Sequence, residues 1–388
     1  MISSKFKKIN TTLLLSAIPV ASMFVCGTHA NAAESWKLRQ SPIGSFGGDI
    51  FAPAEKPGFF GGVSIATPTI TGVKGPTGNT VTIPSGVTNV PLGALSPALA
   101  SAVAPNKYTV SVAEGAVVLN QDQTQINLGG GYITEGTYAD GKLMFAANVP
   151  FIKATRTGSL VFPSATFSGP AGPAQLPATI TGPVNASVKA GADARAKLAS
   201  GSTEGLGDTE LSTVWIKNTD RLRVTAGVSL FVPTGKFDPV RQANLQANTG
   251  FGDFYTVRPG ATFAYNLDPK ERITVAGRVA YGFNTVNKDT QYKSGNFVYA
   301  EGAIAKVIGD VAFGLNVFSI QQISDDSYSG TDKTIVINGR YKTMGGGPFI
   351  SYKLPGEDMA LNFHVSNNFK GESAIVVKTY QLRLIRGF

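Results

Sequence analysis

The feature that most constrains this chain is a set of long segments in which apolar and polar residues alternate. In 272–284, RITVAGRVAYGFN, the odd positions are apolar apart from one glycine, and the even positions are small, polar or basic. The same alternation recurs in 222–232, 255–266 and 359–366. A period of two predicts β-strands with one apolar face. The runs span roughly 10 to 15 residues, against a usual strand of about 5 to 6, and a strand needs roughly 9 to 11 to cross a membrane.

The connections between these runs alternate in length. Short turns rich in Asn, Asp, Gly and Pro occur at 138–142, 217–221, 266–272, 307–310 and 354–358. Long polar loops occupy about 71–122, 155–207, 235–253, 285–295 and 324–335, with a shorter one at 368–373. This pattern is typical of bacterial outer-membrane barrels. The sequence therefore predicts an all-β protein, a closed transmembrane antiparallel β-barrel of about 12 strands with long extracellular loops and short periplasmic turns. The expected strands are 57–70, 123–136, 141–154, 208–218, 221–234, 254–267, 271–284, 296–307, 309–323, 336–353, 358–368 and 374–388.

The N-terminus has the features of a secretory signal peptide. Three lysines precede an apolar stretch, which ends in small residues at 30–32, so residues 1–32 are expected to be removed. Removal would lower the formal net charge from +9 to +6 (9 − 3) and would take away Cys26, the one cysteine. Residues 33–56 are interpreted as an N-terminal segment that could enter the lumen as a plug, and 57–388 as the barrel. The expected location is the outer membrane of a Gram-negative bacterium. Short helices are possible within 91–105 and 185–201. For these two loops and for 33–56 alike, disordered surface segments are at least as good an interpretation.

Little catalytic chemistry is available to the mature chain. It would hold one histidine, His364, and no cysteine, which excludes a His/Cys metal cluster and cysteine catalysis. No phosphate-binding glycine loop follows a predicted strand. We therefore expect no cofactor, no metal and no enzymatic activity. Because the protein is expected to be exported, we do not expect it to bind nucleic acid, although its net charge is positive.

One short string is an exception. FHVSNN at 363–368 is similar to the catalytic strand of outer-membrane lipid hydrolases of the phospholipase A and lipid A deacylase types, which implies Ser366 as nucleophile and His364 as base. The alternation, however, directs both side chains to the lumen, whereas those enzymes attack lipid from the outer wall. Lys378 occupies the position where an acid or amide partner would be expected. A lipid hydrolase is thus an alternative, as is a structural or adhesive barrel that binds a partner through its long loops.

Several arginines are candidates for a lumenal site. By alternation, six would point inward and several strands would contribute, namely Arg223, Arg258, Arg272, Arg278, Arg340 and Arg383. One interpretation is a basic stripe that favours anions or polarises a phenol or carboxylate. The other is that these charges pair with acids such as Glu301 and hold a narrow barrel shut. The sequence leaves both open.

From about residue 204 onward the chain resembles the MetA-pathway of phenol degradation family. The resemblance rests on GLGD (205–208), VPTGKFDP (232–239), NTVNKDTQYKSG (284–295) and QQISDDS (321–327), in this order, and on the final Phe388. It implies an outer-membrane barrel that passes hydrophobic or aromatic compounds, in the manner of the fatty-acid channel FadL. The matched strings place a further group of residues at the extracellular mouth: Lys288, Asp289, Tyr292, Lys293, Gln321, Gln322, Asp325 and Asp326. Each could contact solute or cap a turn.

Together these features predict a constricted channel for passive uptake of a small hydrophobic or aromatic solute. Twelve strands lie between the barrels of about 8 strands, which side chains fill, and the 16- to 18-stranded barrels that leave an aqueous channel. The expected partners are the solute, outer-membrane lipid and lipopolysaccharide, and the barrel assembly machinery. The terminal string TYQLRLIRGF resembles the signal that this machinery reads, except for Arg386, where an apolar residue is usual.

Overall fold

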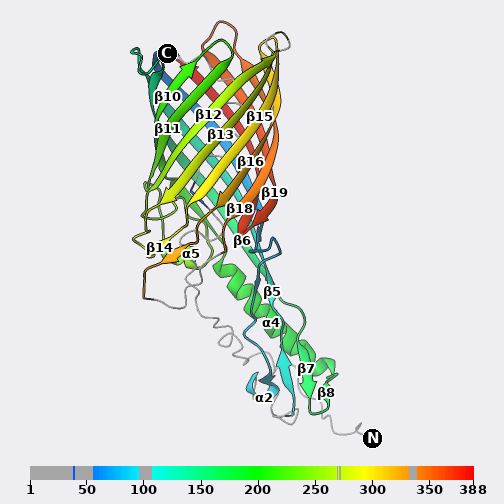
Figure 1. Ribbon diagram of the computed structural model, residues 1–388. Helices are drawn as coiled ribbons and strands as arrows, with labels where there is room; N and C mark the ends of the chain where they lie inside the picture. Colours follow the sequence, from blue (N-terminus) through cyan, green and yellow to red (C-terminus); the bar gives the residue numbers. More distant parts are fainter. Residues whose placement is uncertain (1–37, 40–55, 96–106, 269, 271, 332–338) are drawn as a thin grey trace. The chain divides into compact units, whose positions relative to one another are not determined.

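Twelve long strands form a closed antiparallel barrel in the computed structural model (Figure 1). The structure describes residues 38–39, 56–95, 107–268, 270, 272–331 and 339–388. All twelve predicted strands are present. They are β1 (Gly58–Lys74), β5 (Gly115–Ile133), β6 (Lys142–Val161), β10 (Thr209–Asn218), β11 (Leu222–Val232), β12 (Thr256–Asp268), β13 (Ile273–Asn284), β15 (Phe297–Ile308), β16 (Val311–Gln322), β18 (Lys342–Lys353), β19 (Met359–Glu372) and β20 (Ala374–Gly387).

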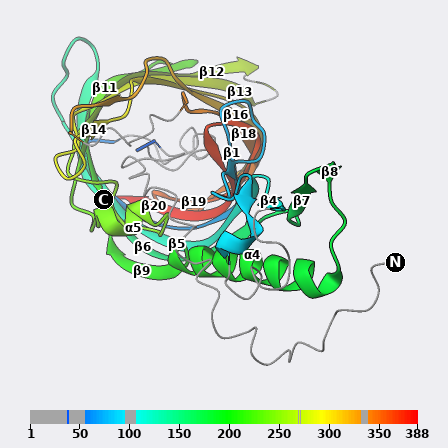
Figure 2. The same cartoon turned by 90° about the horizontal axis from the view of Figure 1, so that it is seen from below.

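The barrel closes through its first and last strands. β1 pairs with β20 from Phe60 opposite Gly387 to Lys74 opposite Ala374, and β5 pairs with both β1 and β6. Viewed along its axis, the strands form a ring (Figure 2). Because each of these twelve strands has two neighbours, the wall of the described barrel has no open edge. Arg386 lies at the rim, where its guanidinium is half exposed and pairs with Glu357 of the β18–β19 turn at 3.2 Å.

Alternation along each strand separates the two faces of the wall, as the sequence predicts. The outward face carries exposed apolar side chains, among them Ile65, Leu128, Phe263, Leu315 and Leu382. The inward face carries buried polar ones, among them Ser64, Asn127, Asn316, Asn362 and Gln381. An apolar outside and a polar inside is the arrangement of a barrel whose solvent is lipid. Among the described residues, no helix is long and apolar enough to cross a membrane.

The two longest connections contribute a second compact unit, built from the described parts of Val81–Val118 and Gly158–Ala199. Its small sheet contains β3 (Val90–Pro91), β4 (Thr109–Ser111), β7 (Thr166–Gly169) and β8 (Gly172–Pro173). It also contains α2 (Leu92–Leu95) and α4 (Ala178–Leu198). Ile180, Val184 and Val188, one turn apart on α4, are buried with Val110 and Phe167 in a hydrophobic core. This burial explains why a segment rich in small residues is helical here.

Most of the remaining elements belong to the barrel unit. They are β9 (Gly201–Leu206), which pairs with β6, α5 (Pro239–Ala243), and the paired strands β14 (Tyr292–Lys293) and β17 (Ser327–Tyr328). β2 (Thr82–Ile83) pairs with the first residues of β5, and these paired residues belong to the second compact unit. Of the predicted loops, that at 368–373 is wrong. β19 and β20 continue until a single residue, Ser373, separates them with a φ of 45°. The predicted signal peptide 1–32 lies outside the described residues, as does most of 33–56.

A glycine in the wall provides a test of the strand pairing. A Cβ on Gly347 of β18 would collide with the backbone carbonyl of Val365 on β19. The backbone itself must then shift, so we expect Gly347→Ala to lose at least about 1 to 3 kcal/mol of stability and to lower the yield of folded barrel. Gly302→Ala is the control, because its Cβ would meet its nearest atom at 3.8 Å. Equal folded yields and unfolding temperatures for the two variants would show that the pairing is wrong.

Candidate lumenal site and loop-end network

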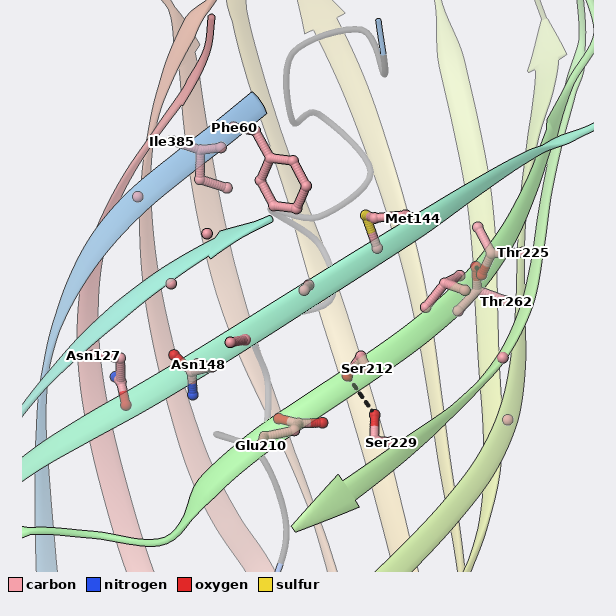
Figure 3. A pocket seen from close by; sticks show the side chains of 18 of the residues that line it. Phe60, Asn127, Met144, Asn148, Glu210, Ser212, Thr225, Ser229, Thr262 and Ile385 are labelled. Carbon is pink, nitrogen blue, oxygen red and sulfur yellow. Dashed lines mark hydrogen bonds between the residues drawn. The ribbon is translucent and has the colours of Figure 1, made fainter. Parts of the chain in front are cut away.

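A cavity of about 390 Å³ lies inside the barrel, lined by residues of β1, β5, β6, β10–β13 and β20. Its lining is dominated by glycine, alanine and neutral polar side chains. Ser212 and Ser229 face each other across β10 and β11 with their hydroxyls 2.8 Å apart (Figure 3). Thr225 and Thr262 make a similar hydroxyl contact at 2.6 Å. These small hydroxyl pairs leave the lumen open where larger side chains would fill it.

Arg258, one of the predicted arginines, lines this cavity beside a carboxylate. Its Nη2 lies 2.6 Å from Oε1 of Glu210, and both side chains are nearly buried. The guanidinium also lies over the ring of Phe231, 4.9 Å from its centroid. The pair therefore places two opposite charges against one wall of the cavity, with the cation held by both the acid and the aromatic face.

Arg278 is arranged in the same way on β13. It pairs with Glu301 of β15, which is opposite it in the strand register and fully buried. Its Nη2 donates to the hydroxyl of Tyr299 at 2.8 Å, and the guanidinium lies over that ring. The prediction that lumenal arginines pair with acids such as Glu301 therefore holds for Arg278. Arg278 nevertheless also lines the cavity, so the two interpretations are not exclusive.

The other four predicted arginines differ in position. Arg383 lines the cavity, and Arg223 shares the inward face of β11 with Thr225 without being part of the lining. The inward prediction is wrong for Arg272, which is exposed in the β12–β13 turn with a φ of 53° and donates to the carbonyl of Gly309. It is wrong for Arg340 as well, because β18 begins only at Lys342. Alternation therefore failed where a turn residue was counted as strand.

The candidate hydrolase pair lies on the lumenal face, as the alternation predicts. His364 and Ser366 of β19 are both buried, and the His364 ring stacks on Phe349 with centroids 5.6 Å apart. No group of three or more His, Cys, Asp or Glu side chains suited to a metal occurs in the part of the chain that the structure describes. Because Ser366 is buried on the lumenal face of β19, a lipid on the outer wall has no access to its hydroxyl.

At the end of the barrel that carries the long connections, the predicted mouth residues form a hydrogen-bonded cluster. The Asp326 carboxylate accepts from the Tyr292 hydroxyl, from the Gly295 amide at 2.7 Å and from the Gln322 side chain. Burial raises the pKa of Asp326, and these three donors oppose that rise. Tyr292 is 2 % exposed. Tyr292 and Gly295 belong to the β13–β15 loop and Asp326 to the β16–β18 loop. These hydrogen bonds therefore hold the two loops together.

The remaining predicted mouth residues are more exposed. Asp325 and Arg340 form an exposed ion pair at 2.8 Å, and Arg340 lowers the pKa of the Asp325 carboxyl. Lys288 and Asp289 both contact Asp253, through its carboxylate at 3.6 Å and its amide at 3.3 Å. Two predicted mouth residues remain. Lys293 pairs with Ser327 in the β14–β17 ladder, and Gln321 is exposed on β16.

A buried arginine from the N-terminal segment was not predicted. Arg39 is 1 % exposed, and its Nη2 lies 2.8 Å from Asp208 and 3.0 Å from the carbonyl of Gly252. Its Nη1 donates to the carbonyl of Phe254, and the guanidinium lies 3.7 Å from the centroid of that ring. We call this arrangement the Arg39 socket. The carboxylate and the carbonyls satisfy the cation, which burial alone would strongly disfavour.

The socket itself is built by hydrogen bonds around Asp208. Its two carboxylate oxygens accept from the amides of Gly235 and Phe251, each at 3.0 Å. Burial raises the pKa of Asp208, while Arg39 and these amides oppose the rise. Leu38, beside Arg39, is buried among aromatic residues that include Phe297 and Tyr341. Leu38 and Arg39 of the N-terminal segment are thus both held inside the barrel unit.

Comparison with known proteins identifies the family. Residues 109–384 match the family described as the MetA-pathway of phenol degradation. The chain belongs to this family. The four strings that indicated the family meet at two carboxylates. GLGD and VPTGKFDP lie around Asp208, and NTVNKDTQYKSG and QQISDDS lie around Asp326. No protein with curated functional information matches the chain.

Solved structures share the fold. An outer-membrane channel from Pseudomonas putida F1 is 14 % identical and aligns over 90 % of this chain and 100 % of its own, with a TM-score of 0.56. Two further structures are more distant. The β-domain of the Bordetella autotransporter BrkA is 8 % identical and aligns over 86 % of this chain and 100 % of its own, with a TM-score of 0.42. The Pseudomonas putida toluene transporter TodX is 11 % identical and aligns over 92 % of this chain and 100 % of its own, with a TM-score of 0.38. At these identities the likeness concerns the fold, which is that of outer-membrane barrels, and only the first is close enough to support it.

Proposed function

We propose that this protein is a constricted outer-membrane channel through which small hydrophobic or aromatic compounds diffuse. The observation that carries the proposal is the lumenal cavity, enclosed by a complete barrel and lined by small, mostly neutral residues. Such a lining offers weak contacts, and conduction requires sites that a solute can both enter and leave. Membership of the family supports this assignment, as does the outer-membrane channel from Pseudomonas putida F1 that shares the fold.

The location and partners follow from the same proposal. The exposed apolar outer face of the strands suits the outer membrane of a Gram-negative bacterium, with lipopolysaccharide around the loop end and the barrel assembly machinery acting during biogenesis. An N-terminal signal peptide would provide export. We further propose that residues 33–56 narrow the lumen, since Leu38 and Arg39 are buried within the barrel unit.

The enzymatic alternative has less support. A hydrolase that acts on membrane lipid must present its nucleophile to the outer wall, and Ser366 is buried on the opposite face of β19. Absence of any phospholipid or lipid A hydrolysis by the purified protein would end this alternative. For the adhesive alternative, the second compact unit offers a folded surface, and deleting it without loss of uptake would separate partner binding from transport.

A block in the lumen tests the channel. Ser212→Trp would place an indole in the cavity, whereas the control Thr213→Trp, one residue along β10, points to the outer wall. In cells with intact lipopolysaccharide, we expect the first variant to reduce uptake of dilute labelled toluene to the level of cells lacking the protein, and the second to leave it unchanged. Uptake that is equal in both variants and in wild type, at equal amounts of folded barrel, would contradict transport through the lumen.

A further inference from the structure

A ladder of amide side chains runs along the inward face of β5. Gln121, Gln123, Gln125 and Asn127 occupy alternate positions, and each side-chain NH2 donates to the carbonyl oxygen of the next amide at 2.8, 3.1 and 2.7 Å. We call these four residues the amide ladder. The exposed residues between them, such as Thr124, point the other way.

Both ends of the ladder are fixed by further hydrogen bonds. At the first end, Nε of Arg156 donates to Gln121 at 2.8 Å. At the other end, Asn127 donates to the hydroxyl of Ser64 at 2.9 Å, and Gln381 approaches the same oxygen at 3.5 Å. All the donors point in one direction, so each bond polarises the next and the chain acts as a unit. Asn127, Ser64 and Gln381 line the lumenal cavity, so the ladder ends there.

The ladder leaves hydrogen-bonding capacity unused. A primary amide has two N–H donors and a carbonyl oxygen with two lone pairs. Within the described residues, each ladder amide uses one donor and accepts one bond. Gln123 and Gln125 are also partly exposed, in contrast to the buried amides on either side. These two side chains can therefore bond to a passing molecule without giving up the bonds that orient them.

The spacing suits stepwise movement of a solute. Successive amides are two residues apart, which corresponds to roughly 7 Å along a strand, and the four span roughly 20 Å. A hydroxyl or carbonyl group could exchange its partner from one amide to the next at little net cost, because a neutral hydrogen bond is replaced by an equivalent one. A hydrocarbon in the same place would cover the polar groups without satisfying them.

We propose that the amide ladder is a binding track for solutes that carry a hydroxyl or carbonyl group, leading along β5 to the lumenal cavity. This inference rests on the proposed channel function and gives it a selectivity. Hydrocarbons and oxygenated aromatics of the same shape would then permeate at different rates, and the difference would arise at Gln123 and Gln125. If the ladder only stiffened β5, its removal would affect folding and leave selectivity unaltered.

Benzyl alcohol and ethylbenzene are a suitable pair of probes, since they differ by a hydroxyl in place of a methyl group. The double variant Gln123→Met and Gln125→Met keeps the size of both side chains and removes their amides, and Thr124→Val is the control on the outward face. Permeation is measured with purified protein in vesicles whose outer leaflet is lipopolysaccharide, after subtraction of protein-free vesicles. We expect the ratio of benzyl alcohol to ethylbenzene to fall about fivefold in the double variant, as loss of one neutral hydrogen bond implies, and to stay constant in the control.

A second readout does not depend on transport. The side-chain amide NMR signals of Gln123 and Gln125, assigned by their loss in each single variant, should shift with benzyl alcohol and not with ethylbenzene. An unaltered permeation ratio in the double variant, or no shift with benzyl alcohol, would overturn the track. Failure of both solutes to cross with wild-type protein would instead refute the channel, and the amide shifts would still decide whether the ladder binds.

Discussion

Replacing Arg39 by alanine is expected to release the N-terminal segment from the barrel and to raise the conductance of the reconstituted protein. The variant would leave the carboxylate of Asp208, whose side chain is 3 % exposed, without its cation. Removing one partner of a buried ion pair costs about 3 to 5 kcal/mol. Loss of the contact with the Phe254 ring adds to this cost. Planar-bilayer recordings and chemical unfolding measure the two effects.

The matched control is an exposed ion pair that also involves the chain before the barrel. Lys56 lies 2.7 Å from Asp358, and Lys56→Ala should change neither conductance nor stability measurably because water screens this pair. Asp208→Asn should reproduce the effect of Arg39→Ala, and the double variant should cost less than the sum of the single ones. Wild-type conductance and stability in both socket variants would mean that Arg39 holds nothing in place.

Removing the carboxylate of Glu210 should shift the ion selectivity of the channel toward anions. Among the residues that the structure describes, the charged ones lining the cavity are Arg258, Arg278, Arg383 and the single acid Glu210. Glu210→Gln would replace the carboxylate that now lies 2.6 Å from Arg258 with a neutral amide, and the lumen would gain one net positive charge. Reversal potentials in a salt gradient measure the change, which should weaken as ionic strength rises.

An acid outside the cavity provides the comparison. Glu204 of β9 pairs at 3.8 Å with Lys153, both are exposed, and Glu204→Gln should leave the reversal potential where wild type has it. Glu301→Gln, which neutralises the carboxylate paired with Arg278, should act in the same direction as Glu210→Gln. A reversal potential that does not respond to either lumenal substitution would show that ions do not pass along this wall.

Much of the barrel could be predicted because its wall obeys a local rule. A strand between lipid and lumen must alternate, so segments such as 272–284 and 359–366 predict both their strands and the inward face of Arg278, His364 and Ser366. The rule stops at turns, which is why it misplaced Arg272 and Arg340. It also underestimates the length of some strands: β5 begins at Gly115, eight residues before the predicted start at 123.

Contacts between distant parts of the chain could not be predicted. Nothing near Arg39 indicates that its partner is Asp208, because a single arginine in a polar segment has no periodic signal. The core of the second compact unit depends in the same way on two long connections meeting, as at Val110 and Phe167. The amide ladder, by contrast, has a readable signal in the alternating amides of QDQTQIN at 121–127, although these polar residues do not enter a pattern of apolar alternation.

The most direct test of the channel is the entry of a monoaromatic solute into vesicles with a lipopolysaccharide outer leaflet that contain only the purified, folded protein. We expect wild type to admit the solute faster than protein-free vesicles, with Ser212→Trp close to the protein-free rate and Thr213→Trp close to wild type. Entry at the protein-free rate with folded wild-type barrel, for every aromatic compound and fatty acid tried, would contradict the account.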